Sequence, residues 1–150
     1  MKSIFEENAY NEIKNRLENL NENATANWGK MNVEQMLEHC TKPIELALGE
    51  SEIKKPNWLK KSLFKLVAPS LYNDKPWKQG LPTAKEYIIT DSLNFNEQKE
   101  KLKTKIDKMS QSKDYFEPSK EHPYFGTFTA EQWGKSAYKH LDHHLRQFGV

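Results

Sequence analysis

Two histidines near the end of the chain, His140 and His144, stand four residues apart. In a helix this spacing places both side chains on one side, with Cβ atoms about 5–6 Å apart. Two neutral imidazoles can then bind one transition-metal ion at nitrogen–metal distances of about 2.0–2.1 Å. On a helical projection both lie within the apolar stripe of Trp133, Ala137, Leu141 and Phe148. Either histidine alone is more typical of a hydrogen-bonded core residue, but together they predict a metal site on a buried helix face.

A metal ion also needs a third protein ligand, and His39 is the candidate from a different helix. It falls beside the apolar face of that helix, so it either turns inward or stays at the solvent edge. His143 lies farther from the apolar stripe, which indicates a position at the surface or next to the ligands. His122 precedes a proline in a predicted loop, where a loop-anchoring hydrogen bond is the simpler interpretation. We consider His143 and His122 as candidate proton carriers.

The pair lacks the glutamate of the zinc-protease motif HExxH, because Leu141 and Asp142 follow His140. Three neutral imidazoles leave a divalent ion its +2 charge and open coordination positions, which is typical of catalytic rather than structural sites. The ligand type permits zinc, nickel, iron or copper. In a metal-free structural or regulatory protein, the same histidines would instead form a polar network in the core. Cys40 is expected to be a small buried hydrophobe.

The elements that must position these histidines are predicted to be helices. A stripe of apolar residues indicates a first helix over about residues 3–20. Asn32 with Gln35, and Thr129 with Gln132, are typical of capping boxes, and they predict the starts of a second helix and of a last helix. A third long helix is expected from the apolar face of Phe95, Leu102, Ile106 and Met109, and residues 122–128 are expected to form a loop.

The second and third long helices are joined by a long crossover, residues 49–90, with four prolines. It contains the basic and apolar segment KKPNWLKKSLFKLV at 54–67, with a short helix predicted at about 57–67. The favoured interpretation is a helix that packs its apolar face on the other helices and leaves its lysines in water. The alternative is a module that binds a membrane surface or a protein partner.

Composition narrows the class of protein. The chain has 150 residues, of which 36% are hydrophobic and 29% charged, and we expect one helical domain over residues 1–150. A net charge of +2 gives no indication of a nucleic-acid partner. The single cysteine excludes an internal disulfide, and the first residues lack the features of a signal peptide. These features favour a cytoplasmic protein, and no stretch is apolar enough for a membrane span.

Two segments, MNVEQMLEHC at 31–40 and KHLDHHLRQFGV at 139–150, resemble the DinB-like (YfiT-like) superfamily of bacterial four-helix proteins. The segment HPYFGTFTAEQW at 122–133 further resembles an uncharacterised bacterial branch with a His-Pro-x-Phe-Gly loop before the last helix. By this resemblance His39, His140 and His144 are the three metal ligands. The resemblance also implies an all-α four-helix bundle of up-down-down-up topology, which needs a long connection where residues 49–90 stand.

Characterised members of that superfamily include thiol-dependent transferases and isomerases, besides proteins named as metal-dependent hydrolases. The resemblance therefore implies a metal-dependent enzyme, with zinc or nickel as the favoured ion. It implies a small-molecule substrate, with a low-molecular-weight thiol as one candidate. A membrane partner is disfavoured, because the favoured interpretation of segment 54–67 is a helix that packs on the other helices. Reaction type does not follow from fold, and the long basic crossover argues against a simple transfer of substrate class. Pairing into a homodimer through an exposed helix face stays open.

Overall fold

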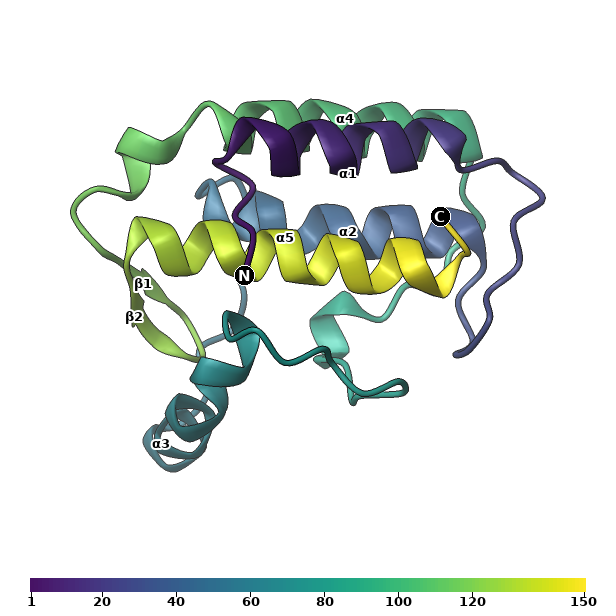
Figure 1. Cartoon of the computed structure of the whole chain (residues 1–150). Helices are drawn as coiled ribbons and strands as arrows, with labels where there is room; N and C mark the ends of the chain where they lie inside the picture. Colours follow the sequence, from purple (N-terminus) through teal and green to yellow (C-terminus); the bar gives the residue numbers. More distant parts are fainter.

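The structure, a computed structural model that describes residues 1–150, is mostly helical (Figure 1). Its five α-helices are α1 (Glu7–Asn19), α2 (Val33–Ala47), α3 (Trp58–Val67), α4 (Phe95–Ser110) and α5 (Ala130–Gln147). Three short 3-10 turns are η1 (Ala68–Leu71), η2 (Lys85–Tyr87) and η3 (Lys113–Phe116), and two strands are β1 (Lys120–His122) and β2 (Gly126–Phe128). The structure contains no helix that is both long and apolar enough to cross a membrane.

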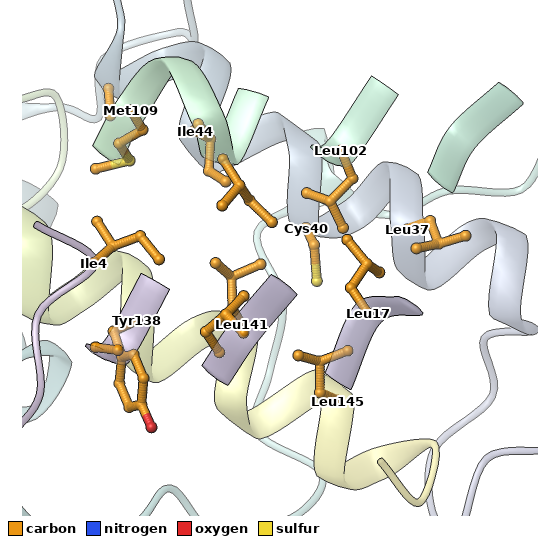
Figure 2. Packing of buried hydrophobic residues seen from close by; sticks show 14 of the residues in the cluster. Ile4, Leu17, Leu37, Cys40, Ile44, Leu102, Met109, Tyr138, Leu141 and Leu145 are labelled. Carbon is orange, nitrogen blue, oxygen red and sulfur yellow. The ribbon is translucent and has the colours of Figure 1, made fainter. Parts of the chain in front are cut away.

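The four long helices α1, α2, α4 and α5 pack on one another around one apolar core. α1 and α2 each contact both α4 and α5, and Figure 1 shows α1 and α4 lying above α2 and α5. Figure 2 shows how side chains such as Leu17, Cys40, Leu102, Leu141 and Leu145 meet between these helices. The expected helical class is confirmed, and so is the burial of Cys40.

Local signals at the helix starts explain where α2 and α5 begin. The Gln35 N–H donates to Asn32 Oδ1 at 2.9 Å, and the Asn32 N–H donates back to Gln35 Oε1 at 3.1 Å. Thr129 and Gln132 form the same reciprocal pair at the start of α5. Both predicted capping boxes are therefore confirmed. α1 begins at Glu7 rather than near residue 3, because the preceding segment lies against α5, where the Ile4 N–H donates to the Gly134 carbonyl at 3.1 Å.

Residues 122–128, expected to be a loop, belong largely to a small antiparallel hairpin. β1 pairs with β2 in the register Lys120 with Phe128 and His122 with Gly126. Gly126 has a φ of +89°, a conformation that suits glycine and closes the turn. Strands of three residues are too short to show a period of two in the sequence, so the loop prediction was wrong here.

α3 does not pack its apolar face on the other helices, which corrects the favoured prediction for segment 54–67. None of its residues is buried, and in Figure 1 it projects away from the other helices. Only the Phe64 ring reaches neighbouring aromatic rings, those of Tyr124 and Phe125 at centroid distances of 5.4 and 5.8 Å. The sequence showed that an apolar face exists but not where it points.

Candidate metal centre

Three histidines from two helices meet beside the core. His39 lies on α2, and His140 and His144 lie one turn apart on α5. One ring nitrogen of each lies within 4.8 Å of those of the other two, and the ring centroids are 4.6–5.0 Å apart. His39 and His144 are buried, whereas His140 stays partly exposed. The three residues predicted as ligands are thus brought together, and His39 faces inward rather than to the solvent edge.

The His39 ring is fixed by a backbone carbonyl of the crossover. His39 Nδ1 lies 2.9 Å from the Tyr87 carbonyl oxygen, which can only accept a hydrogen bond. Nδ1 therefore carries the proton and donates it to this oxygen. In a neutral imidazole the other nitrogen, Nε2, then has a free lone pair, and it points to His140 at 3.0 Å.

The His144 ring is fixed in the same sense by Gln147. The Gln147 amide group donates from Nε2 to the Trp28 carbonyl at 2.5 Å, which turns its Oε1 toward His144. His144 Nδ1 lies 2.8 Å from this Oε1 and must therefore donate to it. The lone pair of His144 Nε2 is left free. Oxygen acceptors that hold the far nitrogen of a histidine in this way are typical of metal-ligating imidazoles.

The spacing of the nitrogens fits a shared ion. Two nitrogens bound to one tetrahedral ion at about 2.0–2.1 Å would lie about 3.3 Å apart. The Nε2 atoms of His39 and His140 are 3.0 Å apart, a few tenths of an ångström from that separation. Without an ion, one proton must lie between these atoms, donated by His140 to His39. For His39 and His140, an ion could therefore replace that proton with little movement of the two rings.

All three imidazoles are held neutral at physiological pH, as metal ligation requires. Burial lowers the pKa of His144 to about 3, and the neighbouring His39 acts in the same direction. Burial, together with the three neighbouring histidines, lowers the pKa of His140 well below its usual range. Burial also lowers the pKa of His39, although its bond to the Tyr87 carbonyl opposes the shift. Protonation of any one imidazole would place a positive charge beside the other two rings, which is unfavourable in a buried site.

The crossover covers this site, and Lys139 attaches it to α5. The buried Lys139 ammonium donates to the Ser70 carbonyl and to both oxygens of Asn73, at 2.8–2.9 Å. Trp77, which follows, lies with its ring 5.9 Å from that of His140 and 5.6 Å from that of His143. The long connection thus supplies both the carbonyl that orients His39 and an aromatic side chain beside the candidate ligands.

A pocket of about 410 Å³ opens next to the three histidines. Its aromatic side is formed by Trp28 and Trp77, and His143 lies between these rings. Its polar side carries both signs of charge, from Lys2, Glu12, Lys139, Asp142 and Arg146. Since Trp77 and His143 contact His140 and His144, they form the boundary between the pocket and the candidate metal centre.

The two candidate proton carriers lie in different places. The His143 ring is 5.1 Å from the His144 ring and lines the pocket, so it is next to the site. His122 ends β1 and packs on Trp133, Phe125 and Phe128, with its Nδ1 accepting from the Tyr124 N–H at 3.2 Å. The structure does not bring His122 to the three histidines. A catalytic role stays a prediction for both residues.

Replacing His122 by phenylalanine should weaken the pH dependence of stability. Burial lowers the pKa of His122 from 6.5 to about 4, so the unfolded chain takes up a proton between these pH values while the folded protein does not. Stability present at pH 7 is therefore lost as pH falls from 6.5 toward 4. Denaturant unfolding of wild type at pH 7 and pH 5 should show a loss about 2 kcal/mol larger than that of His122→Phe. Equal losses would contradict the burial of a neutral His122.

The prediction from sequence missed the residues that orient the ligands. Gln147 stands three residues after His144, a spacing that places both on one helix face, and this signal was available. Tyr87 acts through its backbone carbonyl, which no side-chain pattern can indicate. Nothing in the sequence distinguishes Lys139 from the other lysines, and its burial depends on the carbonyls of Ser70 and Asn73, 69 and 66 residues away in the chain.

The comparison with known families gives one match, which covers nearly the whole chain. Residues 4–149 match the model of a family described as a protein of unknown function, DUF1569. The chain belongs to this family. No match was found among the curated proteins or among the solved structures.

Proposed function

We propose that this protein binds one divalent transition-metal ion through His39, His140 and His144, and that it is a metal-dependent enzyme. The observation that carries the proposal is the orientation of His39 and His144. In each ring the Nδ1–H donates to a fixed oxygen, which leaves an unprotonated Nε2 for the centre of the cluster. A hydrogen-bonded core histidine would also place its N–H on an acceptor, but it would not need its second nitrogen turned toward two other histidines.

An ion bound by three neutral imidazoles would keep its +2 charge and could activate a water or a thiol at an open coordination position. The chain's own residues prepare the site for this chemistry. Gln147 and the Tyr87 carbonyl hold the ligand rings, and the Trp77 ring lies beside His140. His143 lies where it could accept or donate a proton on the pocket side. We propose a reaction of the thiol-transferase or hydrolase type on a small molecule, with zinc or nickel as the ion.

We also infer membership of the DinB-like superfamily and its up-down-down-up four-helix bundle. The grouping of His39 with His140 and His144 supports this inference, because the resemblance implied the same three ligands. The packing of α1, α2, α4 and α5, with the long connection between α2 and α4, supports the topology.

Metal content is the measurement that tests the proposed function. Protein purified without chelator, and then loaded with zinc or nickel and desalted, should hold about one equivalent by plasma mass spectrometry. The His140→Ala/His144→Ala variant should hold none.

A second candidate, the metal-free polar network, is favoured by the existing hydrogen bond between His39 and His140. Equal, negligible metal in both proteins would support that candidate and overturn the metal centre.

A further inference from the structure

α3 presents an apolar surface to solvent rather than to the protein. We call this surface the exposed apolar face of α3 and define it by Trp58, Leu59, Leu63, Leu66 and Val67. Trp58 and Leu66 are each 78% exposed, and Leu59 and Leu63 are each 63% exposed. Successive helical residues rotate by about 100°, so these five side chains fall within about half of the helix circumference. Contiguous apolar surface of this kind marks an interaction site.

The opposite side of α3 faces the rest of the molecule. Phe64 contacts the aromatic rings of the β1–β2 turn, and Lys61 forms an ion pair with Glu121 of β1 at 2.5 Å. The aliphatic stem of Lys65 lies against Gly126. These contacts fix the rotation of the helix about its own axis. The contacts on the opposite side of α3 therefore hold its apolar side chains in an outward orientation.

Lysines border this apolar face on both sides. On the helical projection Lys60 lies next to Val67 at one edge, and Lys65 lies next to Trp58 at the other edge. Lys54 and Lys55 precede the helix, and residues 54–67 contain no acidic side chain. Lys61 is the one lysine of the segment that forms an ion pair. The result is an apolar strip with positive charge along both edges, partly offset by Glu121, which lies near Lys55 and Lys65 as well as Lys61.

We propose that α3 docks the protein on an anionic lipid surface, with the exposed apolar face inserted at the headgroup level and the lysines on the phosphates. Charge complementarity between the lysines and the lipid phosphates favours an anionic lipid surface as the binding partner. A second copy of the same surface would bring two sets of lysines together, which is repulsive. A helix of ten residues is too short to span a bilayer, but it can lie in the interface, where tryptophan is favoured.

The proposal is independent of the metal centre. The three histidines lie on α2 and α5, whereas α3 reaches the rest of the molecule through η1 and the β1–β2 hairpin. Docking through α3 would leave the histidines on a different part of the molecule. Loss of metal binding should therefore leave lipid binding unchanged, and the reverse should also hold.

Vesicle sedimentation with the full chain tests the proposal. Wild type should bind vesicles of phosphatidylcholine with phosphatidylserine, and binding should weaken when salt rises from about 0.1 M to about 1 M. The Leu63→Gln/Leu66→Gln variant should lose at least about tenfold in partitioning, and Lys60→Gln/Lys65→Gln about 30-fold. Tryptophan emission should shift to shorter wavelength on binding in wild type but not in Trp58→Phe.

Matched controls separate docking from general charge and hydrophobicity. The Lys30→Gln/Lys113→Gln variant changes the net charge equally at exposed sites outside α3, and Leu81→Gln removes a leucine that is 48% exposed. Both should bind as wild type does. Absence of binding at low salt, or equal binding to pure phosphatidylcholine, would overturn the proposal. It would also be overturned if wild type were a dimer that Leu63→Gln/Leu66→Gln converts to a monomer without any vesicle binding.

Discussion

Alanine at His144 should lower the affinity for zinc by at least about 100-fold, and alanine at His39 or His140 should do the same. Zinc sites with four protein ligands contribute about 10–16 kcal/mol, so one ligand carries on the order of 3 kcal/mol. With only three protein ligands, no remaining side chain compensates for the loss. Competition titration against a chromophoric chelator at pH 7 measures each dissociation constant.

His143 supplies a matched control for these substitutions. It is the same residue type, lies on the same helix, and its ring is 5.1 Å from that of His144, yet it is not one of the three clustered ligands. Zinc affinity of His143→Ala should stay within about threefold of wild type. Zinc affinity of Gln147→Ala should fall between the two, about 10–100-fold weaker than wild type. The substitution removes the acceptor that orients His144, together with the bond to the Trp28 carbonyl, but it removes no ligand. If His143→Ala loses as much as His144→Ala, the assignment of the ligands is wrong.

The parts of this site that could be predicted are those set by local spacing. The pair His140 and His144 needs only a helix to converge, and the capping box of Thr129 and Gln132 fixes where that helix begins. The position of His39 was ambiguous, because its angle on α2 placed it at the edge of the apolar face. In the structure its inward-facing ring is held by the Tyr87 carbonyl, which lies 48 residues further along the chain.

The sequence pattern of α3 predicts its amphipathic character but not the direction of its apolar face. Its alternation of leucines and lysines predicted an amphipathic helix, and that helix is present as Trp58–Val67. Amphipathicity alone does not say whether the apolar face meets the protein or the solvent. That choice is made by Phe64 and Lys61, whose partners Tyr124, Phe125 and Glu121 belong to a hairpin that the sequence did not reveal. Because the β1–β2 hairpin was predicted as a loop, the orientation of α3 was also predicted wrongly.

Gly134→Ala should destabilise the protein by about 2–3 kcal/mol, although alanine is the better helix former by about 1 kcal/mol. A Cβ atom at Gly134 would lie against Ser3 Oγ and only 2.5 and 2.8 Å from two ring carbons of Phe5. The N-terminal segment is fixed at this place, because the Ile4 N–H donates to the Gly134 carbonyl and the Ile4 side chain is buried in the core (Figure 2). Denaturant unfolding at pH 7 measures the loss.

The position of Gly134 also allows stability and metal binding to be separated. It lies six residues before His140 on α5, beyond the contacts of the three histidines, so Gly134→Ala should keep one equivalent of zinc at unchanged affinity. Adding Ser3→Ala removes the hydroxyl oxygen that the new methyl group meets, and it should restore part of the lost stability. A variant as stable as wild type would mean that residues 3–5 do not lie on α5. Reduced stability with intact zinc affinity would instead show that the metal centre depends on the local geometry of His39, His140 and His144 rather than on the overall stability of the fold.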